Sequence, residues 1–387
     1  MRFPEFHGEW DKCKLGDIAT GFDYGMNAPA KVFDGVNKYI RITDIDEASS
    51  TYNDSDIVSP DGTLTDTYLV NERDILLART GASTGKSYLY KKTDGKLYFA
   101  GFLIRANVPE HNPYFVFSQL HTHRYWKWVS IMSARSGQPG INSQEYSSFP
   151  IYTTSIQEER KISKLLSLLD ERIATQNKLI EDFKKLKSAI IDYAINSLDT
   201  NFAKFGSLYE MAGEGGTPTT SNASFYDNGN IPFIKIDDLK QKYLTENKDF
   251  ITELGLQKSS AWLVPTHSIL FSNGATIGEI SITTYPVCTK QGILGIVPMQ
   301  NIDVEFLYYF MSSSYFKKAV SRIVTEGTMK TVYLKDINNI RCPIPTKEKQ
   351  LDIAKMPSAL NSKIDFEQSI LKLFGSQKQY LLRQMFM

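Results

Sequence analysis

Residues 80–87, TGASTGKS, have the composition of a phosphate-binding loop. In nucleotide hydrolases such a loop uses glycine for close backbone approach, lysine for the phosphates and a hydroxyl residue for magnesium, with four residues between the glycines. Here Gly81 and Gly85 enclose three residues. A matching segment later in the chain, NGATIGE at residues 273–279, has no Lys-Ser pair. The pattern therefore favours a turn supported by glycine over a nucleotide site.

The same turn and a second polar loop, SARSGQPGINSQ at residues 133–144, carry side chains that suit contacts with DNA. Arginine pairs with guanine through two hydrogen bonds, asparagine and glutamine pair with adenine, and lysine and hydroxyl groups bind phosphates. The candidates in these two loops are Arg79, Thr80, Ser83, Lys86, Arg135, Gln138 and Asn142. A plain polar surface loop explains the second segment about as well, so base contact is a hypothesis for each residue.

Composition excludes several classes of protein. The chain has 387 residues, 42% of them apolar, which suggests two or three domains with substantial cores. Its formal charge of +1 gives no general attraction to polyanions, so nucleic-acid binding would depend on local patches. The three cysteines are scattered, and His121 and His123 align with serines in the second half, so we expect no disulfide framework, metal or cofactor. Without a signal peptide or membrane span, we expect a cytoplasmic protein.

A long helix is the element that must position these loops. In residues 155–196, apolar residues recur in alternating steps of four and three from Ile162 to Ala194, which is the seam of a coiled coil. Ser155 and Glu158 have the spacing of a capping box, so the helix has a defined start.

A second helix of the same kind is expected over the last forty or so residues. Its seam runs from Leu360 to Met385, and Pro357 should kink or restart it near Ser358. Because two seams in one chain have a high effective concentration for each other, we expect the helices to pair, and to pair antiparallel. Pairing between two chains stays open as an alternative.

The rest of the chain is rich in β structure. From Trp10 to Tyr152, short runs of β-branched and aromatic residues are divided by Gly, Asn, Asp and Pro, which is typical of a mixed domain dominated by strands. One helix is expected from about Pro113 to Met132. The residues that would share its buried face are Phe115, Leu120, Trp126 and Val129.

The second half of the chain repeats the first, displaced by about 190 residues. DILLARTGASTGK at Asp74 matches HSILFSNGATIGE at His267, and GINSQEYSSFPIY at Gly140 matches TVYLKDINNIRCPIP at Thr331. The repeat adds DNA-binding candidates in the second half: Lys235, Ser272, Asn273, Thr276, Lys290, Gln291, Thr328, Lys330 and Tyr333.

These observations predict an α+β fold with a pseudo-two-fold internal repeat. Two similar, β-rich domains at residues 1–152 and 200–345 would be separated by two long helices at 153–199 and 346–387, paired as an antiparallel coiled coil. Two similar domains related by a dyad suit two DNA half-sites read in opposite strand sense.

Several segments resemble the specificity (S) subunits of type I restriction-modification systems. They are ILLARTGASTGK at 75–86, ILFSNGATIG at 269–278, the helix entries FPIYTTSIQEERKI and CPIPTKEKQLDI, and the ending YLLRQMFM. The resemblance covers essentially the whole chain and lies in the duplicated layout more than in one motif. The chain departs from the family pattern at Pro357 and at Glu279, which stands where the first copy has Lys86.

The resemblance implies that each globular domain is a target recognition domain that reads one half of a split double-stranded DNA sequence. It also implies that the helices hold the domains apart and dock two DNA methyltransferase (M) subunits, to which restriction (R) subunits add. The chain itself would be non-catalytic. The alternatives are a protein-interaction scaffold with two binding domains on a coiled-coil rod and, less favoured, a nucleotide-hydrolysing enzyme that uses residues 80–87.

Overall fold

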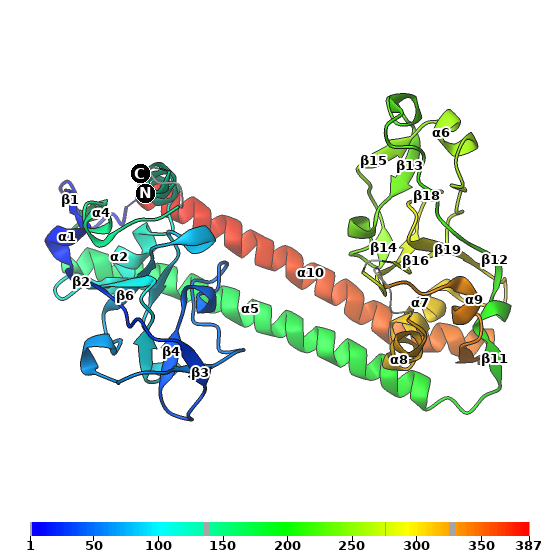
Figure 1. Cartoon of the computed structure of the whole chain (residues 1–387), viewed down its shortest axis with the longest axis horizontal. Coiled ribbons are helices and arrows are strands. Elements are labelled where there is room, and N and C mark those ends of the chain that lie inside the picture. Colours follow the sequence, from blue (N-terminus) through cyan, green and yellow to red (C-terminus); the bar gives the residue numbers. More distant parts are fainter. Residues whose placement is uncertain (1, 135–138, 275, 325–329, 387) are drawn as a thin grey trace. The chain divides into compact units, whose positions relative to one another are not determined.

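Contacts divide the chain into two compact units. Unit 1 consists of Met1–Asn177 and Ser369–Met387, and unit 2 consists of Lys178–Gln368. Each unit contains one globular part and a section of each of two long helices, α5 (Ile156–Asn196) and α10 (Lys347–Met385) (Figure 1). The computed structural model describes residues 2–134, 139–274, 276–324 and 330–386.

The centre of unit 1 is an antiparallel sheet of four strands in the spatial order β2-β9-β6-β7. Its strands are β2 (Thr20–Tyr24), β6 (Asp74–Ala78), β7 (Ser87–Leu89) and β9 (Leu103–Asn107). Three strand pairs complete the unit: β1 (Asp11–Lys14) with β10 (Pro150–Thr153), β3 (Ala30–Val32) with β5 (Val58–Pro60), and, in parallel, β4 (Lys38–Ile40) with β8 (Leu97–Phe99).

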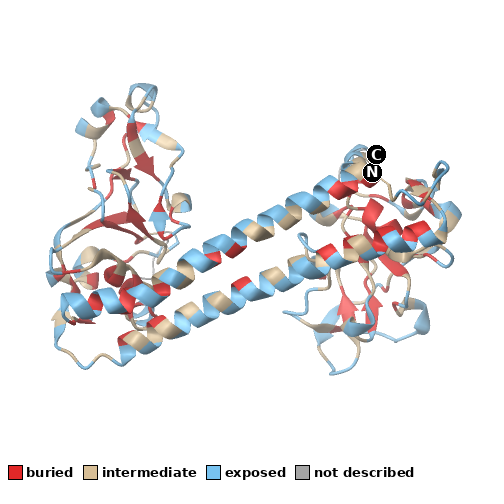
Figure 2. Cartoon of the chain, turned by 180° about the vertical axis from the view of Figure 1, so that it is seen from behind, coloured by how far each residue is buried: buried red, intermediate tan, exposed pale blue. Residues whose placement is uncertain are grey.

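Strand β6 is buried along its whole length. Ile75 and Leu77 face one apolar cluster, whereas Leu76 and Ala78 face another on the opposite side of the sheet. Successive side chains of a strand point to opposite faces, so a strand covered on both faces reads as an unbroken apolar run. This explains the continuous pattern DILLA, and Figure 2 shows the buried residues concentrated in such strands.

The single helix expected from Pro113 to Met132 is wrong. The segment forms two helices, α2 (Pro113–Gln119) and α3 (His123–Ser133). Thr122 begins α3, since its hydroxyl oxygen accepts from the Tyr125 amide at 3.3 Å and donates to the Gln119 carbonyl at 2.7 Å. Trp126, expected on the buried face, is 43% exposed, because the break changes which residues of α3 face the core. The remaining α-helices in the described residues of this globular part are α1 (Leu15–Ile18) and α4 (Ser143–Ser147).

Unit 2 is built on a sheet of five strands in the order β12-β19-β16-β17-β14. They are β12 (Tyr209–Glu214), β14 (Tyr243–Leu244), β16 (Ile269–Ser272), β17 (Ile280–Thr283) and β19 (Ile293–Pro298). Further strands are β13 (Ile231–Ile234) between β15 (Asp249–Ile251) and β18 (Cys288–Thr289), and β11 (Phe202–Lys204) with β20 (Arg341–Pro343). The helices of the globular part are α6 (Glu253–Gln257), α7 (Val304–Ser312), α8 (Ser314–Ile323) and α9 (Leu334–Ile337).

The internal repeat is confirmed by strand order. The order β2-β9-β6-β7 in unit 1 recurs as β12-β19-β16-β17 in unit 2, and the parallel pair β4 with β8 recurs as β13 with β18. A helix pair follows in each unit, α2 with α3 and α7 with α8.

Hydrogen bonding corrects the alignment of the two copies within this repeat. The Arg79 amide donates to the Phe102 carbonyl at 3.0 Å, and the Asn273 amide donates to the Gly292 carbonyl at 2.9 Å. Asn273 is therefore the counterpart of Arg79, whereas an ungapped match from Asp74 to His267 places Ser272 there. The loop after the strand is one residue shorter in unit 2, which accounts for the difference, because short loops vary in length more freely than paired strands.

The capping box expected at the start of α5 forms only in part. The Glu158 amide donates to the Ser155 hydroxyl at 3.4 Å. The Glu158 carboxylate instead accepts from Arg2 and from Thr154, each at 2.6 Å. Because this carboxylate is buried, it pairs with a cation from the N-terminal segment and leaves the cap to the serine alone.

Helix α10 continues through Pro357, so the expected restart near Ser358 is wrong. Proline removes one backbone N–H from the helix ladder. Pro357 is buried in unit 2 and lies at the position that Leu166 holds in the seam of α5. The packing of this apolar face supports the helix across the missing hydrogen bond, since tertiary contacts supply most helix stability.

The two long helices pair antiparallel within one chain. In unit 1, the first part of α5 and the last part of α10 share a core that contains Leu166 and Leu382. In unit 2, the last part of α5 and the first part of α10 share a core that contains Ile191 and Ile353. Opposite ends of the two helices meet in each unit, as the matching seams predict.

Among the described residues, we find no helix with the length and apolar character that a bilayer crossing requires.

Candidate nucleic-acid interface

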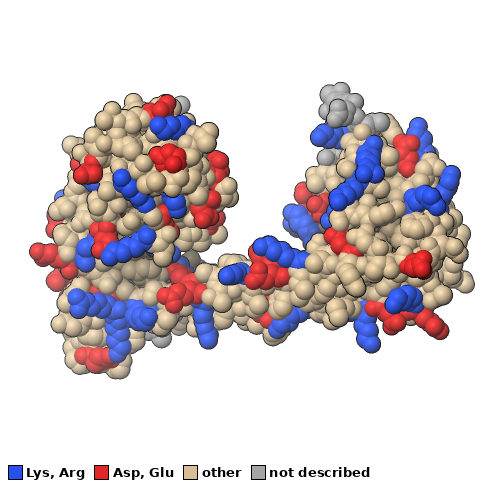
Figure 3. Space-filling view, turned by 90° about the horizontal axis from the view of Figure 1, so that it is seen from below, with Lys and Arg blue, Asp and Glu red and all other residues tan. Residues whose placement is uncertain are grey.

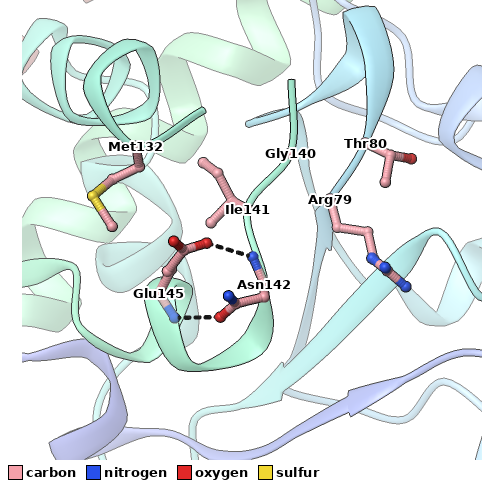
Figure 4. Close-up of a pocket in the computed structure, with 7 residues that line it drawn as sticks. All are labelled: Arg79, Thr80, Met132, Gly140, Ile141, Asn142 and Glu145. Carbon is pink, nitrogen blue, oxygen red and sulfur yellow. Dashed lines mark hydrogen bonds between the residues drawn. The ribbon is translucent and has the colours of Figure 1, made fainter. Parts of the chain in front are cut away.

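In unit 1 the two polar loops singled out in the sequence lie side by side. Thr80 and Gly140 form an isolated antiparallel bridge. The Ile141 amide donates to the Arg79 carbonyl at 2.9 Å, and the Gly81 amide donates to the Pro139 carbonyl at 3.1 Å. The Arg79 amide also donates to the Phe102 carbonyl. The backbone of Arg79 is therefore hydrogen-bonded to the turn at Phe102 and to the loop at Ile141, at the point where its own turn begins. Figure 4 shows this junction.

The junction borders an open hollow of about 260 Å³. Its lining residues are Arg79, Thr80, Met132, Gly140, Ile141, Asn142 and Glu145. Asn142 and Glu145 form a reciprocal cap of α4, in which each side chain accepts from the other residue's amide at 2.9 Å (Figure 4). The Asn142 side-chain oxygen that would accept from adenine therefore already accepts from the Glu145 amide.

The Arg79 guanidinium lies over the ring of Tyr24, 4.7 Å from the ring centroid. It also donates to the Gly101 carbonyl at 3.3 Å. The Tyr24 hydroxyl is 3.3 Å from the Ser143 hydroxyl and accepts from the Ser143 amide at the same distance. These Ser143 contacts lower the pKa of Tyr24, and the Arg79 charge adds to the effect.

Lys86 and Ser83 occupy the turn between β6 and β7. Lys86 pairs with Glu47 at 3.1 Å, and the Glu47 side chain is 85% exposed. The Lys86 side chain is 18% exposed, so it is the exposed Glu47 carboxylate that can move away and leave the ammonium to a phosphate. Ser83 ends a single 3-10 turn, where its carbonyl accepts from the Lys86 amide at 3.0 Å.

Glycine shapes this turn. Gly85 has φ of +92°, and a Cβ there would meet Val129 at 2.7 Å. Only glycine fits this close approach in the left-handed region without strain. The sequence interpretation of a turn supported by glycine therefore agrees with the structure.

Three of the DNA-binding candidates lie outside the described residues. They are Arg135, Gln138 and Thr328.

In unit 2 the counterpart junction is organised around Asn273. Gly274 and Thr331 form the matching bridge, and the Val332 amide donates to the Asn273 carbonyl at 2.9 Å. The Asn273 side chain is 1% exposed and donates to the Val332 carbonyl at 3.1 Å. Ser272 is fully buried, donates to the Thr276 carbonyl and accepts from the Glu279 amide at 2.8 Å. Neither side chain reaches the surface, so a contact with DNA would require the loop to open.

The other described candidates of unit 2 are exposed. Lys235 pairs with Asp249 at 2.7 Å. The Gln291 amide donates to the Thr217 hydroxyl at 3.2 Å, which leaves the Gln291 side chain outside this contact. The exposed candidates are Lys235, Thr276, Lys290, Gln291, Lys330 and Tyr333. Three of the loops that carry them meet at the backbone of Asn273, as the turns of unit 1 meet at Arg79.

Charges of both signs are mixed on the face that Figure 3 shows, where Lys and Arg lie among Asp and Glu. This agrees with the formal charge of +1.

Among the described residues, no group of three or more His, Cys, Asp or Glu side chains is placed to hold a metal ion. The sequence had not indicated Tyr24, because an aromatic residue within a strand pattern is commonly explained by packing.

Comparison with known proteins agrees with the repeat. Residues 7–185 and residues 199–373 each match the family model of the type I restriction modification DNA specificity domain. The chain belongs to this family of DNA specificity subunits.

Specificity subunits of other type I restriction enzymes match all or part of the chain. The chain is 23% identical over 398 residues to the type I restriction enzyme MjaVIII specificity subunit of Methanocaldococcus jannaschii, a match that covers 94% of this chain and 90% of the relative. It is 35% identical over 115 residues to the HindI specificity subunit of Haemophilus influenzae, which covers 30% of this chain and 25% of the relative. A crystal structure of the type I S subunit from M. genitalium has the same fold, with a TM-score of 0.59, 17% identity and coverage of 98% of this chain and 96% of that chain.

Proposed function

We propose that the chain recognises a bipartite DNA target, with one globular domain on each half. The domains are residues 1–152 and 200–345, the boundaries that the sequence repeat predicts. The observation that carries the proposal is the repetition, in both units, of a sheet whose turns converge on one residue. Two copies of one recognition module suit a target that is split into two half-sites.

The same proposal gives the long helices two roles: to separate the domains and to dock two DNA methyltransferase (M) subunits, which restriction (R) subunits then join. Leu179, Leu186 and Tyr193 are exposed on α5 at steps of seven residues. A heptad stripe outside the paired seam suits contact with helices of a partner. In this role the chain binds and positions the other subunits and is itself non-catalytic.

Sequencing of modified bases across the host genome, with and without the chain, tests the proposal. The strain must supply the methyltransferase partner. We expect a split motif with methylated adenine on opposite strands to disappear when the chain is deleted. Unchanged methylation in the deletion strain contradicts the proposal.

A protein-interaction scaffold is the alternative that the mixed surface charge favours. A scaffold needs no attraction to polyanions, whereas a DNA reader does. The two functions differ in one measurement, the binding of the purified complex of chain and methyltransferase to duplex DNA at moderate salt. Failure to bind any duplex favours the scaffold.

A further inference from the structure

Arg79 has the surroundings of a base-reading arginine. Its guanidinium stacks on Tyr24 at 4.7 Å, and among the described residues its one side-chain hydrogen bond is to the Gly101 carbonyl. An aromatic face below the guanidinium fixes the plane of the donor fork while leaving its edge free. The side chain also extends away from the Asn142 and Glu145 pair in Figure 4.

Three other arginines of unit 1 form ion pairs within the fold, and Arg73 and Arg124 donate to carbonyl oxygens. Arg2 pairs with Glu158 at 2.6 Å, and Arg105 pairs with Asp23 at 2.9 Å. Arg41 forms ion pairs with two aspartates. Arg79 has no ion pair with any described residue, although it is only partly exposed. With one side-chain hydrogen bond among the described residues, the half-buried Arg79 guanidinium keeps most of its donors available for an external acceptor.

The geometry of the fork selects the acceptor. A planar guanidinium matches the O6 and N7 atoms of guanine with two parallel hydrogen bonds, which is the commonest specific arginine contact in the major groove. A phosphate also accepts two bonds, but it carries no sequence information. The tyrosine platform restricts the direction of the fork, which suits a fixed base edge better than a mobile backbone contact.

Unit 2 lacks this arrangement at the equivalent position. Asn273 replaces Arg79 and is 1% exposed, and its side-chain amide donates to the Val332 carbonyl. The repeat therefore preserves the backbone junction and changes the side chain that it presents. The two halves of the chain differ in what this position can read.

We propose that Arg79, positioned by the ring of Tyr24, reads a guanine in the half of the target bound by the first globular domain, and that the second domain lacks this contact. The inference rests on the proposed function, since it assumes that the junction faces DNA. Tyr24 is a positioning residue, because it acts through Arg79.

The test uses the complex of the full chain with its methyltransferase partner and the split duplex found by modified-base sequencing. Each guanine of each half is replaced in turn by 7-deazaguanine, which keeps base pairing and removes the N7 acceptor. With the native chain, we expect affinity to fall by about tenfold at one guanine in one half. With Arg79→Met, the same substitution should have little effect, because methionine has no hydrogen-bond donor to offer to guanine.

Tyr24→Leu should reduce the penalty at that same guanine, whereas Tyr24→Phe, which keeps the ring, should retain it. A residue that only stabilised the fold would change affinity for every duplex alike. Arg160→Met, at an exposed arginine of α5 in unit 1, is the matched control and should leave the penalty intact.

The outcomes separate this inference from the proposed function. If the native complex binds no split motif, the proposed function fails. If it binds such a motif and Arg79→Met leaves every guanine penalty unchanged, only the Arg79 assignment fails. If Arg79→Met weakens all duplexes equally, Arg79 contacts phosphate and the inference is overturned.

Discussion

At the scale of the residue, His121 is a neutral histidine held by two contacts. Its Nδ1 lies 2.9 Å from the Phe117 carbonyl, and its Nε2 lies 2.9 Å from the Ser50 hydroxyl. A ring that donates from Nδ1 and accepts at Nε2 satisfies both partners. Burial lowers the pKa of His121 to about 4, and the nearby Lys378 charge adds to this effect.

The lowered pKa predicts acid sensitivity. Between its unfolded pKa of about 6.5 and its folded pKa of about 4, the unfolded chain binds a proton that the folded chain does not, so stability falls as pH falls. His121→Gln should remove about 1–2 kcal/mol of the native loss between pH 7.5 and 4.5, less than the full shift implies, because the residue is only partly buried. Urea unfolding at a series of pH values measures it.

His123 supplies the matched control for that experiment, because it is an exposed histidine two residues further on. His123→Gln should leave the pH dependence close to native. If both variants follow the native curve, His121 is not the group responsible.

At the scale of the element, Lys242 ties the start of β14 to two helices of unit 2. Its ammonium pairs with Glu305 of α7 at 2.9 Å and donates to Ser358 of α10 at 2.9 Å. The side chain is 2% exposed. Tyr243 and Ser358 also donate to the Glu305 carboxylate. This polar cluster lies next to Pro357, where α10 lacks one backbone hydrogen bond.

Lys242→Met should destabilise unit 2 by about 2–3 kcal/mol, because it leaves the Glu305 carboxylate without its cation. Adding Glu305→Leu should recover part of the loss. Lys240→Met is the control, since Lys240 is exposed and lies 3.9 Å from its partner Asp237, and it should change stability by no more than about 0.5 kcal/mol. Denaturant unfolding compares the three variants, and equal losses for Lys242→Met and Lys240→Met would contradict the prediction.

A charged pair joins the two long helices in unit 1, between a seam residue of α10 and a residue beside the seam of α5. Lys378 of α10 lies 2.6 Å from Asp170 of α5, and Tyr114 also donates to this carboxylate. In unit 2, the corresponding Lys187 donates to Asn361 at 2.9 Å. Polar seam residues commonly set helix register rather than add stability.

Replacing both members of the first pair, as Lys378→Leu with Asp170→Leu, should therefore be neutral or stabilising, whereas Lys378→Leu alone should cost about 1 kcal/mol. Lys184→Met is the control, because Lys184 pairs with Glu181 on the exposed surface of α5. Thermal unfolding of the full chain distinguishes these cases. A double variant less stable than the single one would show that the pair itself stabilises the helices.

At the scale of the whole molecule, affinity for DNA should depend on local lysines, since the net charge is +1. Lys86→Ala should weaken binding of the methyltransferase complex to all duplexes by a similar factor and reduce the slope of log affinity against log salt by about 1. Glu47→Gln should act in the opposite direction, because it frees Lys86 from its 3.1 Å ion pair. A Lys86→Ala effect confined to one sequence would contradict a phosphate contact.

The sequence by itself determined the architecture of this molecule. Local or periodic signals predicted the long helices, the β-rich domains and the internal repeat. The structure confirms the two helices α5 and α10 and the repeated sheets. These signals can be read from the sequence because an apolar stripe with a fixed period must be buried against a surface of the same period.

Only the tertiary structure decided which residues meet. The sheet pairs strands far apart in sequence, so the stacking of Tyr24 under Arg79 and the equivalence of Asn273 with Arg79 depend on strand register. The break at Thr122 depends on a side chain that caps one helix and bonds to the end of another. The passage of α10 through Pro357 depends on packing. In each case contacts between distant residues outweigh the local preference of the chain.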